Sequence, residues 1–484
     1  MSNIKTSFLW SAIERLATQI IQLIVMLYLA RLLGPEAFGL VGMLAVFIAI
    51  SQTFVDSGFS SALIRNTERT EEDFSTTFYF NIGVGVFCYA ILFIVAPFIA
   101  RFFDQIELIS LLRVLGLTVI VNSFAIVQRV KLTIEMDFKT QAKASLISVF
   151  VSCGAGIWLA NTGYGVWALV GQTISNALCN VVLLNIYLRW LPTTGFSKSS
   201  FNYLFGFGSK LLAAGLLDTI FKNIYQIVIG KQFSANQVGL FSQANQLASV
   251  PAITLTSVIQ RVTYPMLSNM QNDIEKFDKT YLLTLRMAAV FVFPLMVGLG
   301  LIATPLIIIL LGEKWLQAAE LLTIISVAVM LYPVHAINLN LLNVKGRSDI
   351  FLKLEVIKKT LLFCILCITI PLGIKAICIG MVIQTYIAFF INSFYAGQFS
   401  KLNTSKQLKA LLPIWIGVFA CAVVTHGVYL VISYNIGQVF YMQLVVNLSV
   451  LPLLYIFFIR LTQRDLYNIT VATMFGRNVV IKKN

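Results

Sequence analysis

The sequence is poor in charge and in histidine, and both shortages exclude classes of protein. Charged residues make up 11% of the chain and hydrophobic residues 58%, which is far from the composition of soluble domains. The two histidines, His335 and His426, lie in different apolar segments with no second ligand at i+3 or i+4, so we expect no metal site. The phosphate-binding pattern G-x-x-x-x-G-K-[S/T] is also missing, which excludes a built-in ATPase of that kind.

Long polar loops are missing as well. The predicted external loops have roughly ten residues or fewer, whereas a membrane polymerase or glycosyltransferase normally needs a larger loop that carries acid/base carboxylates. The acidic stretch 67–73 (TERTEED) has the character of a solvated charge run at the end of a span. We therefore predict that the protein is not an enzyme.

Long apolar segments dominate the chain. A membrane span needs roughly 20 apolar residues, and about fourteen segments approach this length. An even number of spans places both termini on one side of the membrane. The segments are approximately 8–30, 40–63, 77–100, 108–128, 144–160, 166–188, 205–229, 238–260, 281–311 (with a break near Pro305), 318–343, 354–371, 376–397, 410–432 and 438–459.

Basic residues concentrate in alternate gaps between these segments. About 27 of the 35 Lys and Arg residues fall in the termini and the even-numbered gaps, and short loops rich in Lys and Arg stay cytoplasmic. This pattern predicts a multi-pass membrane protein with both termini in the cytoplasm. The net charge of +15 is spread over these loops rather than gathered on one face, so we expect no nucleic-acid partner.

Short similarities about 200 residues apart indicate an internal repeat. Residues 29–41 (LARLLGPEAFGLV) correspond to residues 229–241 (IGKQFSANQVGLF), which aligns Gly39 with Gly239. The repeat covers six spans, so its copies share one orientation and are related by a pseudo-two-fold axis along the membrane normal. We predict an all-α polytopic membrane protein of about fourteen transmembrane helices, in two pseudo-symmetric six-helix lobes plus two C-terminal helices. The predicted parts are an N-lobe (1–190), a cytoplasmic linker (191–204), a C-lobe (205–398), and the last two spans with a cytoplasmic tail (399–484).

Ionisable residues inside the predicted spans are the strongest functional signal. A charge at the bilayer centre costs about 2.5–3.5 kcal/mol, so it normally faces a water-filled cavity or a partner. Span 1 carries a polar stripe, and its repeat partner, span 7, carries charges at i, i+4 spacing that can pair. We predict a hydrophilic cavity between the lobes; the alternative is that these charges pair and merely hold the bundle together. The predicted cavity residues are Glu14, Arg15, Asp56, Lys210, Asp218, Lys222 and Arg261.

Three motifs near the N-terminus resemble a known family. Residues 28–39 read YLARLLGPEAFG, residues 56–65 read DSGFSSALIR, and residues 73–81 read DFSTTFYFN. Together they resemble bacterial polysaccharide exporters of the MOP (multidrug/oligosaccharidyl-lipid/polysaccharide) superfamily. Within it, they look most like the Wzx-type flippases of the colanic-acid and teichuronic-acid exporter branch. The G-P-x-x-F-G turn between spans 1 and 2 is the most specific of these features, because it is an unusual connector.

This resemblance implies a flippase for lipid-linked glycans. Such a protein moves an undecaprenyl-pyrophosphate-linked oligosaccharide from the cytoplasmic to the external leaflet of the bacterial inner membrane by alternating access, for capsule, exopolysaccharide or O-antigen-type synthesis. Its partners would be the lipid-linked oligosaccharide, membrane lipids and the polysaccharide polymerase or other assembly proteins. No cofactor is expected, but an ion gradient or the membrane potential could drive transport. Three other functions stay open: a drug/cation antiporter of the same superfamily, a membrane enzyme of polysaccharide assembly, and a scaffold that transports nothing.

Overall fold

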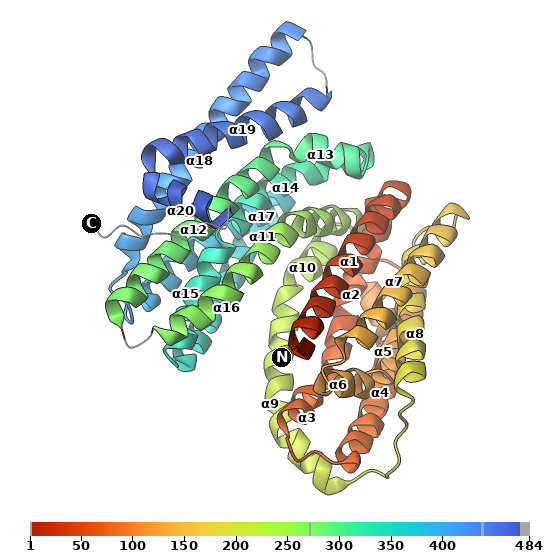
Figure 1. Cartoon of the computed structure of the whole chain (residues 1–484). Helices are drawn as coiled ribbons and strands as arrows, with labels where there is room; N and C mark the ends of the chain where they lie inside the picture. The colour runs from red at the N-terminus through yellow and green to blue at the C-terminus, as the bar shows by residue number, and fades with distance from the viewer. Residues whose placement is uncertain (1, 271–272, 437–439, 475–484) are drawn as a thin grey trace. The chain divides into compact units, whose positions relative to one another are not determined.

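The computed structural model describes the backbone of residues 2–270, 273–436 and 440–474. Within these ranges it describes every side chain except those of residues 2–9, 11–16, 262, 348, 435–436, 440 and 470–474. Every element of regular secondary structure in this part of the chain is a helix, which confirms the predicted all-α class (Figure 1). The helices are α1 (Ser2–Leu33), α2 (Pro35–Asp56), α3 (Phe59–Arg65), α4 (Glu71–Phe103), α5 (Leu108–Ser123), α6 (Ile126–Ile134), α7 (Phe138–Asn161), α8 (Trp167–Leu188), α9 (Lys198–Lys222), α10 (Ile224–Gln232), α11 (Ala235–Asn269), α12 (Ile274–Leu301), α13 (Ala303–Leu310), η1 (Glu313–Trp315), α14 (Leu316–Val329), α15 (Tyr332–Val344), α16 (Ser348–Thr369), η2 (Ile370–Leu372), α17 (Ile374–Ala396), α18 (Thr404–Ile436), α19 (Phe440–Thr462) and α20 (Arg464–Met474).

Most predicted spans coincide with helices that are long and apolar enough to cross a membrane. Eleven stretches of the described chain meet both conditions. The predicted spans 8–30, 238–260 and 354–371 lie in α1, α11 and α16, which are not among the eleven. The predicted count of fourteen is therefore not confirmed. The reason is polarity: α11 carries many amides and α16 carries several charges. Of α1, only the apolar part Ala17–Leu33 could be assessed.

Several predicted spans consist of two helices joined by a short break. Between α2 and α3, Ser57 and Gly58 have φ angles of 46° and 71°. This left-handed conformation ends one helix and lets the next begin in a new direction. The predicted break near Pro305 also exists, because α12 and α13 are separated at Ile302.

The chain divides into two compact units, Met1–Ser242 and Gln243–Asn484. Within the first unit, α7 packs along α8 and α1, and α4 packs along α5 (Figure 1). Helix α9 packs on α2 and α3, so its contacts assign it to the first unit, although the predicted C-lobe begins at residue 205. The predicted lobes are defined by a sequence repeat, which this division does not test, and they stay a prediction.

Helix α12 organises the second unit. Helices α14, α15, α18 and α19 all pack against it. Its side chains Tyr281, Phe293 and Met296 are fully buried. These large apolar groups hold the unit together by close packing, which is the main source of association between helices in lipid.

The structure explains each glycine and the proline of the G-P-x-x-F-G motif. Gly34 has a φ of 79° between α1 and α2, and Pro35 is the first residue of α2. Gly39 lies so close to α11 that a Cβ there would overlap the carbonyl oxygen of Ala235. A Cβ on Gly239 would likewise overlap the carbonyl oxygen of Pro35. All four residues belong to the first unit, and the two contacts join the positions that the sequence repeat aligns.

Candidate functional site

The structure places the predicted cavity residues in different parts of the chain. The side chains of Glu14 and Arg15 lie outside the described residues. Arg261 lies on α11 in the second unit, where it is exposed. The other four residues lie in the first unit, at the end of α2 and along α9: Asp56, Lys210, Asp218 and Lys222.

Helix α9 lies directly against the break between α2 and α3. A Cβ at Gly58 would come within 2.7 Å of the Gly208 carbonyl oxygen, and a Cβ at Gly208 within 2.6 Å of the Ser57 carbonyl oxygen. Only glycine fits both positions without a shift of backbone. Further along, the hydroxyl oxygens of Thr53 and Thr219 are 3.1 Å apart. The structure thus brings together the two helices that carry these four predicted residues.

Asp56 lies at this junction and is half-buried. Its carboxylate accepts a hydrogen bond from the hydroxyl of Ser60, one turn further along the chain. Lys210 follows Gly208 on α9 and is exposed. The DSGFSS motif therefore combines a helix break, a close contact with α9 and a hydroxyl that orients the carboxylate.

Asp218 and Lys222 form the ion pair that their spacing predicts. The Lys222 Nζ is 2.6 Å from the Asp218 Oδ2, and the two side chains are 72% and 56% exposed, respectively. The pair lies beside Asn223, where α9 ends and α10 begins. Because charges in hydrocarbon are costly, an exposed pair on a membrane-spanning helix favours water around this face of α9. Whether all seven predicted residues line one cavity stays a prediction.

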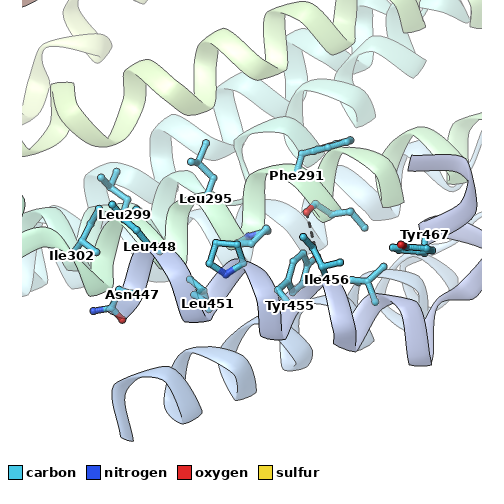
Figure 2. Close-up of a pocket in the computed structure, with 15 residues that line it drawn as sticks. Phe291, Leu295, Leu299, Ile302, Asn447, Leu448, Leu451, Tyr455, Ile456 and Tyr467 are labelled. Carbon is cyan, nitrogen blue, oxygen red and sulfur yellow. Dashed lines mark hydrogen bonds between the residues drawn. The ribbon is translucent and has the colours of Figure 1, made fainter. Parts of the chain in front are cut away.

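A second feature, which the sequence analysis did not identify, is an apolar pocket of about 560 Å³ in the second unit (Figure 2). We call it the apolar pocket. Phe291, Leu295 and Leu299 line it from α12, and Leu451 and Ile456 line it from α19. Its remaining lining residues are Val290, Pro294, Gly298, Ile302, Asn447, Leu448, Pro452, Tyr455, Ile459 and Tyr467.

The polar atoms around the apolar pocket are mostly bonded to the protein itself. The Tyr455 hydroxyl donates to the Val290 carbonyl oxygen at 3.2 Å, as Figure 2 shows. The Asn447 amide nitrogen donates to the Gln443 carbonyl oxygen at 2.7 Å, whereas the Asn447 Oδ1 is buried and has no hydrogen-bond donor among the described residues. A ligand in this pocket therefore meets mainly hydrocarbon. A proline within each of the two lining helices was the available sequence signal, because proline removes a backbone donor and bends a helix.

Comparison with known proteins identifies the family. A family model described as "Polysaccharide biosynthesis protein" matches residues 28–320, which include all three motifs. The chain belongs to this family. The teichuronic acid biosynthesis protein TuaB of Bacillus subtilis is 26% identical over 70% of this chain and 71% of its own length. The lipopolysaccharide biosynthesis protein WzxC of Escherichia coli is 27% identical over 90% of this chain and 88% of its own length.

Solved structures share the fold. The lipid II flippase MurJ, in an inward closed conformation, matches with a TM-score of 0.74 and 15% identity over 94% of this chain and 99% of its own. An inward-facing multidrug resistance MATE family transporter of the MOP superfamily matches with a TM-score of 0.62 and 18% identity over 81% of this chain and 96% of its own. The predicted resemblance to MOP-superfamily polysaccharide exporters is confirmed, and the chain is a multi-pass membrane protein.

Proposed function

We propose that this protein is a flippase that carries an undecaprenyl-pyrophosphate-linked oligosaccharide from the cytoplasmic to the external leaflet of a bacterial inner membrane, with both termini cytoplasmic. Membership of the polysaccharide biosynthesis family supports a glycan substrate. A similar protein, ExoT of Rhizobium meliloti, is described as a succinoglycan biosynthesis transport protein, which supports transport rather than synthesis. We infer that the protein makes and breaks no covalent bond and needs no cofactor.

The apolar pocket is the observation that carries this proposal. A lipid-linked glycan has a hydrocarbon tail that must stay out of water while its head crosses. A pocket of about 560 Å³ with an almost entirely hydrocarbon lining fits part of a polyisoprenyl chain. Such a lining offers the tail the same hydrocarbon surroundings as the bilayer, so the tail can enter the pocket without meeting water. A small hydrophilic cation would gain little from this lining.

The driving force in this proposal is the membrane potential acting on the pyrophosphate. An inside-negative potential contributes about 2.3 kcal/mol per charge per 100 mV, so outward movement of an anion is downhill. Lysine or arginine that travels with the anion reduces this gain. The Asp218–Lys222 pair is neutral as a unit, so it offers a cation to the substrate only when the substrate displaces the carboxylate.

The test is the fate of lipid-linked glycans in cells depleted of the protein. Mass spectrometry with a leaflet-accessibility probe should find one complete repeat unit accumulating on the cytoplasmic side. Accumulation of unpolymerised units on the external side would instead indicate an assembly enzyme. Unchanged glycan lipids together with new sensitivity to cationic drugs would replace the proposal with a drug antiporter.

A further inference from the structure

A second pocket lies inside the first unit, and its lining is the opposite of the apolar pocket. It has a volume of about 240 Å³ and is formed by α1, α6, α7 and α8. Two apolar side chains, Val149 and Leu184, also line it. We call it the amide pocket, after its polar lining residues Gln22, Arg129, Gln141, Ser145, Asn176 and Asn180.

The break between α5 and α6 sets the position of the arginine. Helix α5 ends at Ser123 and α6 starts at Ile126, so Arg129 lies on a short helix with its own direction. Its Nη2 donates to the Asn180 Oδ1 at 2.7 Å. The preceding residue, Gln128, donates to the Asn185 Oδ1 at 2.8 Å. Two successive residues of α6 therefore fix it to α8 and orient the guanidinium at the pocket.

The lining excludes some ligands. None of the residues that line the amide pocket in the described chain is acidic, so the pocket offers no charge that would hold a cation. The Gln141 Oε1 is buried and has no hydrogen-bond donor among the described residues. A buried acceptor of this kind costs free energy unless a ligand or water donates to it. Phosphate oxygens accept and cannot donate, whereas a sugar hydroxyl can do both.

We propose that the amide pocket binds one hydroxyl-rich sugar unit of the glycan head group during its translocation. This inference rests on the proposed flippase function and deepens it, since it assigns part of the sugar specificity to Gln141, Asn180 and Arg129. The volume of about 240 Å³ lies below the roughly 300–1,000 Å³ of pockets for drug-sized ligands, which suits one sugar ring rather than a whole oligosaccharide. The amides supply paired donors and acceptors, and the guanidinium adds donors for a ring oxygen or an acidic substituent.

A signal for this pocket exists in the sequence but was not used. Gln141 and Ser145 are four residues apart at the start of the predicted span 144–160, Gln141 just before it, and Asn176 and Asn180 are four apart on the next span. This spacing puts each pair on one face of its helix. The prediction relied instead on the charges of spans 1, 2, 7 and 8. A charge costs more free energy in a membrane than a neutral amide, so it is the stronger functional signal.

The first test is ligand protection of a cysteine in the pocket. Ser145→Cys and a control on the same helix, the exposed Lys143→Cys, are purified as full-length protein and treated with methyl methanethiosulfonate. Mass spectrometry of the peptide that carries each new thiol keeps the seven native cysteines out of the measurement. The probes are the undecaprenyl-linked glycan extracted from depleted cells and undecaprenyl pyrophosphate without sugar.

The glycan lipid should slow labelling at Ser145→Cys by about fivefold or more, leave Lys143→Cys unchanged, and surpass the sugar-free lipid. Equal protection by undecaprenyl pyrophosphate would overturn the sugar assignment in favour of the pyrophosphate. An unreactive Ser145→Cys, or no protection while the glycan lipid co-purifies with the protein, would overturn the inference and leave the flippase function standing. Failure of the glycan lipid to bind at all would count against both.

The second test separates ligand binding from a structural role. Gln141→Leu removes the buried acceptor that has no protein donor. The thermal stability of the ligand-free protein should therefore stay the same or rise. We expect export of the glycan to fall about tenfold in Gln141→Leu despite normal stability, the scale of one lost neutral hydrogen bond to a substrate. Gln141→Glu keeps an acceptor oxygen and should retain most of the export. Normal export by Gln141→Leu would contradict the inference.

Discussion

The amide pocket of the first unit and the apolar pocket of the second unit are both lined by helices, but they differ in the polarity of the side chains that face a ligand. In the amide pocket, amides and an arginine project from α6, α7 and α8. In the apolar pocket, leucine, isoleucine and phenylalanine project from α12 and α19, while the tyrosine hydroxyl of Tyr455 is used internally. Most of the polar lining that distinguishes the amide pocket comes from four residues: Gln141, Ser145, Asn176 and Asn180.

This contrast matches the two parts of an amphiphilic substrate. A sugar needs hydrogen-bond partners in place of water, and a polyisoprenyl tail needs hydrocarbon. A chain that binds both within one bilayer has to keep the two linings apart, and here each lies within its own unit. We therefore expect an apolar substitution to impair binding in the amide pocket and a polar substitution to impair binding in the apolar pocket.

The largest expected effect concerns the charges of α9. Lys222→Ala should lower glycan export about 100-fold at unchanged membrane levels, the scale of one lost hydrogen bond between charged groups. The double change Asp218→Lys with Lys222→Asp keeps the ion pair but exchanges its ends. If the cation contacts the substrate, the exchange should not restore export. Export is measured as surface polysaccharide per molecule of protein in the membrane.

Full recovery by the exchanged pair would show that Asp218 and Lys222 only hold the helix together. Arg261→Ala tests the same cationic mechanism in the second unit and should also abolish export. Normal export by both Lys222→Ala and Arg261→Ala would show that these two cations do not contribute to export.

The next effect concerns the apolar pocket. Leu448→Asp places a charge in its lining, and we expect export to fall about tenfold because the tail would then meet a carboxylate. Leu453→Asp is the matched control, since Leu453 lies on the same helix and is 69% exposed, against 56% for Leu448, but does not line the pocket. The measurement is the amount of glycan lipid that co-purifies with each variant. Equal losses in the two variants would mean that the pocket has no special role for the tail.

The smallest effect on export should come from a change in packing that alters neither lining. Gly39→Ala or Gly239→Ala forces a Cβ onto a neighbouring backbone and should cost about 1–3 kcal/mol of stability. Export per folded molecule should stay unchanged. Gly83→Ala is the control, because no atom lies within 4 Å of its Cβ position, and it should be neutral or stabilising by about 0.5–1 kcal/mol. Thermal unfolding in detergent checks both; a lower transition temperature for Gly83→Ala would contradict the packing explanation.

The helices were largely predictable because a bilayer imposes a simple length and polarity rule on each span. The rule works less well for α11 and α16. Lys358 and Lys359 interrupt the apolar run of α16, and two prolines and many amides interrupt that of α11. The break at Ser57–Gly58 was not predicted, although a Ser-Gly pair is a local turn signal, because the apolar run around it favours one continuous span.

The candidate site was predictable in part. The Asp218–Lys222 pair follows from spacing on one helix, and the structure contains it. The amide pocket needs helices far apart in sequence to converge, and no spacing rule places Arg129 against Asn180. The apolar pocket is harder still, because its lining residues have the same composition as any lipid-facing surface.

The reciprocal contact at Gly39 and Gly239 bears on the origin of the chain. In a symmetric dimer the interface is self-complementary: one residue of each subunit meets a second residue of the other, and the reverse. Pro35 against Gly239 and Ala235 against Gly39 have this form when the aligned repeat positions are treated as one. Fusion of the genes of two identical partners would leave such a contact. On the predicted repeat, the contact is the former interface of a homodimer, and each copy was free to acquire its own chemistry after the fusion.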